Sequence, residues 1–355
     1  MEDRIQKLMQ ALPSDIDGVL ITSPVNRQYF TGFSSSAGVV LATRGQAWFI
    51  IDSRYAEAAQ RVVNACQVVW QKNVYEQLNA FIQKAGIRTL AVESGFMSLK
   101  SFAAYRERLE AVELLGDNLL TEAIACQRCI KSREEIQCIR RAQRIADQTF
   151  SYILGRIEAG RTEREIALEL EFHSRKLGSE GPAFQFIVVS GKNSSLPHGA
   201  PSDKKLEPGD LVTMDFGAIV GGYCSDMTRT VAVGSISEEQ RHVYETVLAA
   251  QRAALQSIRA GAVCSEVDKV ARDLIDTSYQ DAFGHGLGHS LGLEIHEEPR
   301  FSPACQTVLE PGMILSVEPG IYLPGKYGVR IEDIVAVTET GCENLTASNK
   351  ELVIV

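Results

Sequence analysis

An internal repeat in the last two thirds of the chain constrains the fold more than any other sequence feature. A predicted long helix ending Ile157-Glu158-Ala159-Gly160 is matched by another over residues 237–261, which ends Ile258-Arg259-Ala260-Gly261. A second predicted helix follows each of them and is expected to be capped where it opens, at Thr162 and at Ser265. The same succession of helices therefore occurs twice.

The strand segments repeat in the same way. Residues 207–217 align without a gap with residues 310–320, and Asp215 falls on Glu318. We therefore expect two similar halves that face each other across a pseudo-twofold axis. A site shared between them would draw carboxylates from both.

The first third of the chain has a different pattern, because β-rich runs alternate there with helix-like stretches, which is typical of a small α/β domain. The β-rich runs are residues 18–22, 38–43, 47–51 and 89–92, and a helix is expected over residues 53–63. The pattern changes near Cys126, where Ser132 and Glu135 form a capping box that opens a helical period. A chain of 355 residues exceeds the usual size of one core. We therefore predict an α/β (α+β) protein with two domains, residues 1–125 and 126–355.

Composition excludes several classes of protein. No apolar run approaches the roughly 18 residues of a membrane span, so we expect a soluble protein without a membrane partner. The net charge of −9 repels a phosphate backbone and argues against nucleic-acid binding. The eight cysteines lack the dense spacing of a disulfide scaffold, so reduced thiols and a cytoplasmic location are expected. Cys126 and Cys129 have redox or zinc spacing, but no second pair completes such a site.

The first candidate site feature is a pair of aspartates in a predicted hairpin over residues 211–233. If Val220 and Gly221 are the central turn residues, Asp215 and Asp226 lie directly opposite each other, with Cβ atoms about 4.5 to 5.5 Å apart. Two carboxylates at that distance repel each other unless a cation lies between them. For an isolated pair, the alternative of two solvated strand-end aspartates is the simpler interpretation.

The second predicted hairpin favours the interpretation that a cation lies between the carboxylates. Residues 315–337 turn at Pro324-Gly325-Lys326 and bring Glu318 near Glu332, with Glu318 at the position that the repeat equates with Asp215. Between the hairpins lies a glycine-rich segment, residues 284–296, that holds three of the six histidines. Its glycines favour a strand or turn close to the centre over a helical zinc motif, and no Gly-Lys-Ser/Thr follows to make a phosphate loop.

Four carboxylates and the imidazole of His289 form an oxygen-rich ligand set. Such a set suits manganese, cobalt or iron(II) better than a structural zinc ion. Two divalent ions would nearly neutralise the carboxylates, and a pair about 3.5 to 4 Å apart can activate a water for attack on a carbonyl.

These residues resemble the M24-type metallopeptidases, the creatinase and methionine aminopeptidase clan with a two-fold "pita-bread" fold. The likeness is greatest to the Xaa-Pro dipeptidases (prolidases) and aminopeptidase P, and it runs from Asn26-Arg27-Gln28-Tyr29-Phe30-Thr31-Gly32-Phe33 to Glu332. The motifs that carry it are Met214-Asp215-Phe216-Gly217, Ser225-Asp226-Met227-Thr228-Arg229-Thr230, Gly284-His285-Gly286-Leu287-Gly288-His289, His296-Glu297-Glu298-Pro299, Val317-Glu318-Pro319-Gly320 and Arg330-Ile331-Glu332-Asp333.

The resemblance implies two divalent metal ions per chain. Asp226 and Glu332 would hold both, Asp215 would complete one, and His289 with Glu318 would complete the other. Manganese is the first expectation, with cobalt, zinc and iron(II) as alternatives. The expected reaction is hydrolysis of the bond between an amino-terminal residue and proline in short peptides, by a homodimer.

The resemblance also implies roles for residues around the metals. Glu318 would relay protons, His198 and His296 would orient the substrate and stabilise the tetrahedral intermediate, and His285 would lie in the substrate pocket. For each histidine alone, a structural role with satisfied hydrogen bonds is the simpler interpretation.

Two arginines have two interpretations each. Arg330 is two positions before Glu332, so its side chain points to the same face, where it would anchor a carboxylate or gate the site. Alternatively, it is the charge partner of Asp333 or Glu298. Arg300 resembles the prolidase arginine that receives the terminal carboxylate of a dipeptide, or else it pairs with Glu297 or Glu298 on the surface.

Three other functions share this fold. Creatinase hydrolyses a carbon–nitrogen bond without metals, but it lacks the ligand set that is complete here. Pita-bread domains also serve as peptide-binding modules with decayed ligands. Methionine aminopeptidase typically lacks a creatinase-type amino-terminal domain, so the first 125 residues of this chain argue against that function.

Overall fold

The protein has the predicted mixed α/β fold. The structure is a computed structural model that describes residues 2–355, and the chain divides into two compact units between Arg128 and Cys129. The sequence places the division at residues 125 and 126. None of the described helices combines the length and apolar character needed to cross a membrane.

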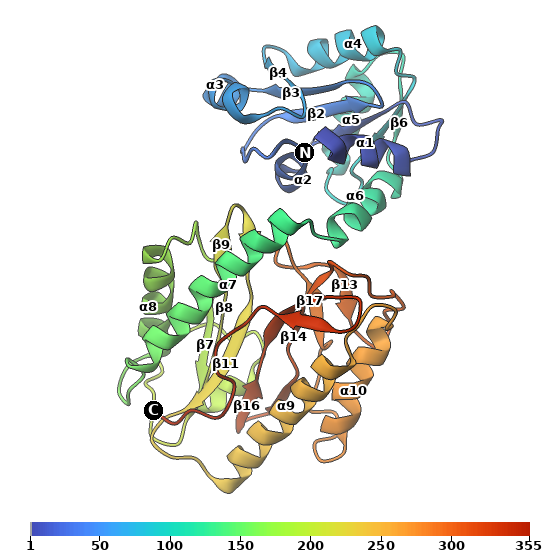
Figure 1. The fold of residues 1–355 in the computed structure, drawn as a ribbon. Helices are drawn as coiled ribbons and strands as arrows, with labels where there is room; N and C mark the ends of the chain where they lie inside the picture. The colour runs from blue at the N-terminus through green and yellow to red at the C-terminus, as the bar shows by residue number, and fades with distance from the viewer. Residues whose placement is uncertain (1) are drawn as a thin grey trace. The chain divides into compact units, whose positions relative to one another are not determined.

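The amino-terminal unit is a six-stranded sheet with helices (Figure 1). Its strand order is β4-β3-β2-β1-β5-β6, with β1, β5 and β6 parallel to one another. The strands are β1 (Gly18–Ile21), β2 (Val39–Thr43), β3 (Ala47–Ile51), β4 (Gln67–Trp70), β5 (Thr89–Val92) and β6 (Glu113–Leu115). The helices are α1 (Glu2–Ala11), α2 (Pro24–Thr31), α3 (Ser53–Val62), α4 (Val74–Ala85), α5 (Leu99–Arg108) and α6 (Leu119–Cys129).

The carboxy-terminal unit contains the two predicted halves. The first consists of α7 (Arg133–Leu154), α8 (Glu163–Lys176), a short 3-10 helix (Gly191–Ser195) and strands β7 (Ile187–Ser190), β8 (Leu211–Phe216), β9 (Ile219–Val220), β10 (Tyr223–Cys224) and β11 (Met227–Ala232). The second consists of α9 (Glu238–Ser257), α10 (Cys264–Asp276) and strands β12 (Gly288–Ser290), β13 (Glu297–Phe301), β14 (Ile314–Val317), β15 (Gly320–Leu323), β16 (Tyr327–Arg330), β17 (Asp333–Val337) and β18 (Cys342–Asn344). Each half therefore carries a helix pair and a sheet.

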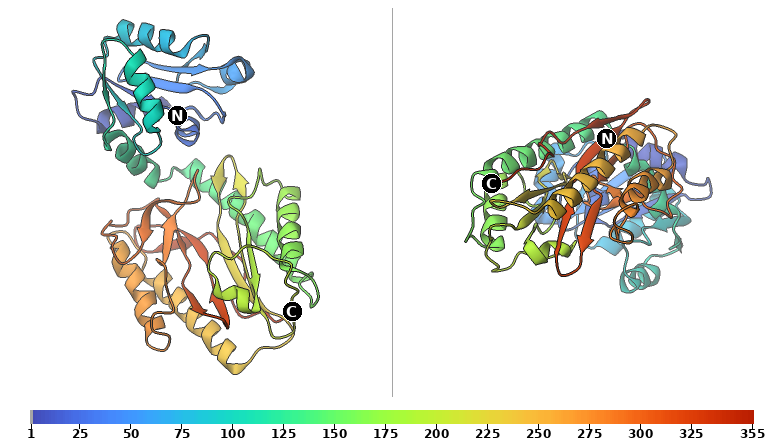
Figure 2. Two further views of the ribbon diagram at one scale, coloured as in Figure 1. Left: turned by 180° about the vertical axis from the view of Figure 1, so that it is seen from behind. Right: turned by 90° about the horizontal axis from the view of Figure 1, so that it is seen from below.

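Each helix pair packs against the sheet of its own half. Apolar residues of α7 and α8 join β7, β8 and β11 in one core cluster, while those of α9 and α10 join β14 and β17 in another. The sheet orders are β11-β8-β7 and β13-β12-β14-β17-β18. In Figure 1, α7 and α9 cross in front of the strands, and the strands face the viewer when the molecule is turned around in Figure 2.

Local sequence signals explain where most of these helices begin. The predicted capping box at Ser132 and Glu135 opens α7, and Thr162 caps α8. The predicted cap of α10 is wrong, because Val263 precedes the helix and no side chain caps it. The backbone N–H groups of Cys264 and Ser265 bond instead to carbonyls of the segment around Cys305, so that start of the helix needs no capping side chain.

The register of the first hairpin also differs from the expectation. Thr228, not Asp226, lies opposite Asp215, and the central turn residues are Gly221 and Gly222. Both glycines have positive φ, +61° and +79°, as a type I′ hairpin turn requires and a valine disfavours. The shift is two positions, so Asp226 still shares a face with Asp215.

In the second hairpin, the predicted turn at residues 324–326 is confirmed. β14 pairs with β17 and β15 with β16 in one continuous register, in which Glu318 faces Glu332. Both hairpins thus direct a pair of carboxylates toward the middle of the unit.

Candidate metal centre

The structure brings all ten predicted site residues to the wall of one cavity. The cavity has a volume of about 500 Å³ and lies within the carboxy-terminal unit. The ten residues come from both halves and are His198, Asp215, Asp226, His285, His289, His296, Arg300, Glu318, Arg330 and Glu332.

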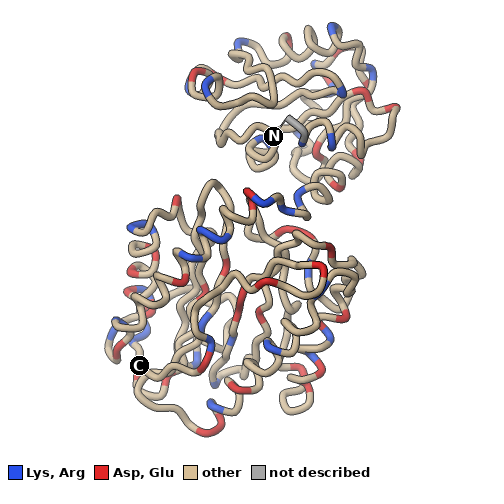
Figure 3. Tube along the Cα trace, in the orientation of Figure 1, with Lys and Arg blue, Asp and Glu red and all other residues tan. Residues whose placement is uncertain are grey.

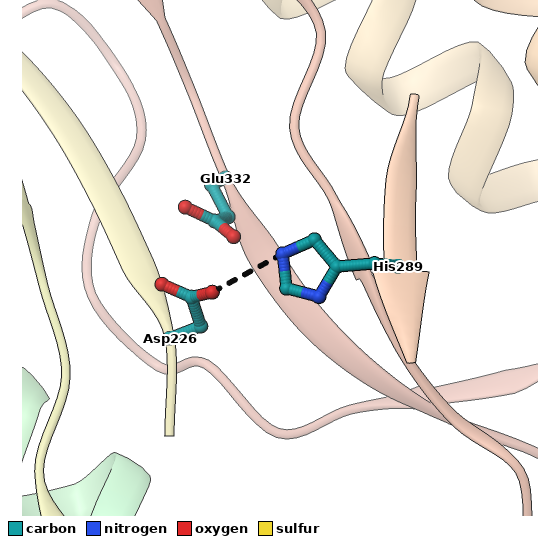
Figure 4. Close-up of side chains that lie close together, drawn as sticks. All are labelled: Asp226, His289 and Glu332. Atoms are coloured by element: carbon teal, nitrogen blue, oxygen red, sulfur yellow. Dashed lines mark ion pairs between the residues drawn. The ribbon is translucent and has the colours of Figure 1, made fainter. Parts of the chain in front are cut away.

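Three of them form the inner cluster. One ligand atom from each of Asp226, His289 and Glu332 lies within 4.8 Å of the others, and all three side chains are buried. Figure 4 shows the imidazole of His289 directed at the two carboxylates, with its Nε2 atom 3.5 Å from Oδ2 of Asp226. The same nitrogen lies 3.3 Å from Oε1 of Glu318. The cluster therefore has the donor types of a divalent metal site.

Unpartnered oxygens show that the cluster fits cations. Among the described residues, Oδ1 of Asp215, Oδ1 of Asp226 and Oε1 of Glu332 are buried without a hydrogen-bond partner. Burial of an unpaired carboxylate oxygen is costly unless a cation or donor satisfies it. We therefore conclude that the residues present suit divalent ions.

The electrostatics of the cluster agree with this conclusion. Burial, followed by the neighbouring carboxylate of Glu332, raises the pKa of Asp226 well above its ordinary value. Burial and the nearby Glu318 and Asp215 do the same for the pKa of Glu332. A bound divalent cation would reverse the effect by stabilising the ionised carboxylates.

Arg330 pairs with the predicted ligand Asp215. Its Nη2 atom donates to Oδ2 of Asp215 at 2.7 Å. The two predicted charge partners, Asp333 and Glu298, are wrong, because Asp333 pairs with Arg229 at 2.7 Å and Glu298 lies 3.4 Å from Arg300. Arg330 therefore neutralises one of the four carboxylates from within the protein.

Two residues around Arg330 were missed by the sequence analysis. Nε of Arg330 donates to the hydroxyl of Thr228 at 3.1 Å, and that hydroxyl donates to Oε2 of Glu332 at 2.6 Å. Nη1 of Arg330 donates to the hydroxyl of Tyr322 at 2.8 Å. Strand alternation from Asp226 could have pointed to Thr228. The signal for Tyr322 is Gly328 opposite it, where an added Cβ would lie 2.8 Å from the tyrosine ring.

Ser316 was missed in the same way. Its hydroxyl donates to Oε1 of Glu318 at 3.0 Å and accepts the backbone N–H of His289 at 3.0 Å. It is two positions before Glu318 and shares its face by alternation. One serine therefore positions two of the candidate ligands.

The histidines differ in their surroundings. Burial lowers the pKa of His289, so the ring is neutral and able to ligate a metal. The ring of His296 meets that of His289 edge-on, with centroids 4.4 Å apart. Desolvation and the neighbouring His289 and Arg300 lower the pKa of His296 to about 4. His285 is half-buried, with Nε2 3.0 Å from the hydroxyl of Tyr322, whereas His198 is exposed on the cavity wall.

Arg300 lies at the cavity and also near a surface carboxylate. Its Nε atom is 3.4 Å from Oε1 of Glu298, and both side chains are more than half exposed. An exposed pair of this kind contributes little stability. The guanidinium is thus free to exchange Glu298 for a ligand's carboxylate.

Comparison with known proteins gives a consistent result. Residues 137–339 match the model for metallopeptidase family M24, and residues 3–124 match the creatinase/prolidase N-terminal domain. The chain is 39% identical over 357 residues to an Xaa-Pro dipeptidase of Pyrococcus furiosus, covering 99% of this chain and 100% of the relative.

Solved structures are similar over the same span. An Xaa-Pro dipeptidase from Bacillus anthracis has a TM-score of 0.95 and 41% identity, covering 99% of each chain. An X-Pro aminopeptidase from Thermotoga maritima has a TM-score of 0.93 and 37% identity, covering 99% of this chain and 100% of that one.

Proposed function

Since the chain belongs to metallopeptidase family M24, we propose that it hydrolyses the peptide bond between an amino-terminal residue and proline in short peptides. The observation that carries the proposal is the set of buried, unpartnered carboxylate oxygens on Asp215, Asp226 and Glu332, which come from both halves and border one cavity. Small peptides suit a cavity of about 500 Å³. Acidic and basic positions are interspersed along the chain, whose net charge is −9, which does not favour nucleic acid (Figure 3).

Two divalent ions would be held by Asp215, Asp226, His289, Glu318 and Glu332. When bound, they supply Lewis acidity at the scissile carbonyl and at the attacking water. Manganese fits the oxygen-rich donor set best, with cobalt, iron(II) and zinc as alternatives.

Glu318 is the proposed proton carrier. Burial raises the pKa of its carboxyl above the ordinary value, which brings the group closer to the operating pH of a general base. It takes a proton from the attacking water and returns it to the departing proline nitrogen. The hydrogen bond from Ser316 at 3.0 Å holds its Oε1 atom in place.

His198 and His296 are the proposed donors to the oxygen that becomes negative during the attack. Because the pKa of His296 is about 4, its ring is neutral at physiological pH and donates a hydrogen bond without carrying a charge. His285 and Arg300 border the same cavity and are proposed to bind the rest of the substrate. Arg300 would receive the carboxylate of a dipeptide.

We also propose a location and an assembly. All eight cysteines are free thiols, which suits a reducing compartment such as the cytoplasm. A homodimer is proposed from the resemblance to prolidases. Light scattering that gives the 38.9 kDa monomer at micromolar concentration would count against it.

The decisive experiment is a hydrolysis panel with added manganese, cobalt or zinc. It compares Xaa-Pro dipeptides, Xaa-Pro-Yaa tripeptides and Met-Ala-Ser. We expect cleavage of Xaa-Pro bonds only. Cleavage of Met-Ala-Ser would indicate a methionine-aminopeptidase-like enzyme, and fewer than one metal ion per chain without cleavage would indicate a peptide-binding module.

A further inference from the structure

α10 carries an ion pair outside the cavity between a buried aspartate and a partly exposed arginine. Asp268 is 1% exposed, and Arg272, one turn later, grips it with Nε 2.9 Å from Oδ2 and Nη2 3.0 Å from Oδ1. Neither residue lines the cavity. An ion pair with a buried carboxylate is weak evidence for a purely stabilising role, because apolar residues of similar volume often serve as well. The other hydrogen bonds of Asp268 and Arg272 therefore indicate what else the pair does.

The remaining hydrogen bonds of the pair go to the backbone of residues 283–287. Arg272 donates from Nη1 to the carbonyl of Phe283 at 2.8 Å and from Nη2 to the carbonyl of His285 at 2.7 Å. Oδ1 of Asp268 accepts the N–H of Leu287 at 2.9 Å. The guanidinium carbon also lies 4.4 Å from the ring centre of Phe283. One ion pair thus holds alternate peptide groups of this segment.

The same segment faces the candidate site through His285. Its Nε2 atom lies 3.0 Å from the hydroxyl of Tyr322, which accepts a hydrogen bond from Arg330. Gly284 and Gly286 flank His285 and have broad backbone freedom, so local preferences do not set the direction of the imidazole. The contacts with α10 fix the backbone that carries the imidazole, whose Nδ1 atom also lies 2.8 Å from the carbonyl of Gly286.

We propose that Asp268 and Arg272 are positioning residues that set the place of His285 in the substrate cavity, and thereby the affinity for the peptide. The proposal deepens the proposed function and rests on it. For Arg272 the expected effect is on substrate binding, because its hydrogen bonds go to the carbonyls of Phe283 and His285. Asp268 holds Leu287, whose carbonyl accepts the backbone N–H of Glu318, so the test uses changes at Arg272.

The test is a double-mutant cycle of Arg272→Met and His285→Ala, measured on Xaa-Pro dipeptides with manganese. We expect Arg272→Met to raise KM by about 10-fold or more with kcat nearly unchanged, because a small displacement of a binding group weakens substrate binding. In the His285→Ala background the same change should have almost no further effect. Equal losses in both backgrounds, or a loss confined to kcat, would overturn the proposal.

A matched control lies on the same helix. Lys269 pairs with Asp273 in an exposed i,i+4 ion pair, with side chains 69% and 63% exposed, so Lys269→Met should leave KM unchanged. Arg272→Lys keeps the charge next to Asp268 but offers fewer donors to the two carbonyls, so it should have an intermediate KM. This second variant keeps the test valid if Arg272→Met does not fold.

A spectroscopic arm separates this proposal from the proposed function. In protein labelled with ¹⁵N-histidine, the imidazole signals of His285, assigned by their loss in His285→Ala, should shift in Arg272→Met and not in Lys269→Met. Unchanged signals would overturn the positioning role whether or not the protein cleaves peptides. Failure of the wild-type protein to cleave any Xaa-Pro bond, with the signals shifted, would defeat only the proposed function.

Discussion

The hydroxyl of Thr228 donates a 2.6 Å hydrogen bond to Oε2 of Glu332, a residue 104 positions away in the other half of the repeat. The same hydroxyl accepts a hydrogen bond from Nε of Arg330 at 3.1 Å. The Thr228 hydroxyl of the first half therefore orients the Glu332 carboxylate and the Arg330 guanidinium, which both belong to the second half. Outer partners of this kind fix the direction of metal ligands.

Thr228→Val tests this role. The variant keeps the shape of the side chain but leaves Oε2 of Glu332 without its donor, so metal affinity should fall by about 10- to 100-fold. Competition titration with a chelating indicator measures the affinity, and Thr228→Ser should restore most of it. A Val variant that binds metal as tightly as the wild type would contradict the assigned role.

Metal removal and Asp226→Asn test the ligand set. Chelation should abolish activity, and manganese or cobalt should restore it. Asp226→Asn removes a charge and a donor oxygen, so kcat/KM should fall by more than the roughly 100-fold that loss of an outer partner costs. Asp273→Asn, on the exposed face of α10, is the control and should be unaffected. Activity that persists after metal removal would contradict the proposed metal-dependent mechanism.

Arg300→Ala tests the preference for dipeptides. Loss of a charged hydrogen bond to the substrate's carboxylate should raise KM for Xaa-Pro by roughly 10-fold or more and spare Xaa-Pro-Yaa. Glu298→Gln removes the exposed partner at 3.4 Å and should leave both substrates nearly unaffected. Equal effects of Arg300→Ala on dipeptides and tripeptides would favour an aminopeptidase P.

Arg229→Met tests the contribution of a buried ion pair to stability, measured by unfolding and not by activity, because Arg229 also donates to the backbone carbonyls of Thr228 and Glu332. Arg229 pairs with Asp333 at 2.7 Å, and their side chains are 1% and 0% exposed, so its loss should lower the free energy of unfolding by about 3 to 5 kcal/mol. Urea unfolding measures the change. Arg252→Met, which removes an exposed partner of Glu351, is the matched control and should cost less than about 1 kcal/mol.

The same pair predicts a pH dependence of stability. Although burial alone would raise it, the charges of Arg229 and Lys350 hold the pKa of Asp333 below its ordinary value. A carboxyl with a lowered pKa stabilises the folded state above its ordinary pKa, and this contribution is lost as the pH falls through the lowered value. Urea unfolding at acidic pH should therefore show a smaller difference between wild type and Arg229→Met than at pH 7.

Local signals in the sequence predicted the two hairpins and the four long helices of the repeat, but only some of the elements of the amino-terminal unit. Capping motifs at Ser132 and Thr162 act within one helical turn, so they can be recognised without tertiary information. β4 and β6 escaped prediction because both lie at sheet edges and are only partly buried, so neither has a clear apolar pattern. The register of the first hairpin depended on which residues accept positive φ, and the glycine pair decided it.

The residues of the candidate site could be predicted from the sequence, but the hydrogen-bond partners of Arg330 and Arg272 could not. The motifs and the internal repeat pointed to all ten residues that have a proposed role and line the cavity. The partner of Arg330 was not predictable, because Asp215 is brought to it only by the packing of the two halves. The contacts of Arg272 with residues 283–285 likewise depend on how α10 packs.

The pairing of Arg330 with Asp215 also affects how the chain folds during synthesis. Asp215 leaves the ribosome 115 positions before the arginine that neutralises it, and Asp226 likewise precedes Glu332 and His289. Until then, final packing of the first half would bury carboxylates without partners, which is costly. The carboxy-terminal unit is therefore expected to fold as one cooperative block, late in translation. A fragment that ends before α9 should stay loosely packed when expressed alone and become ordered when mixed with the missing half.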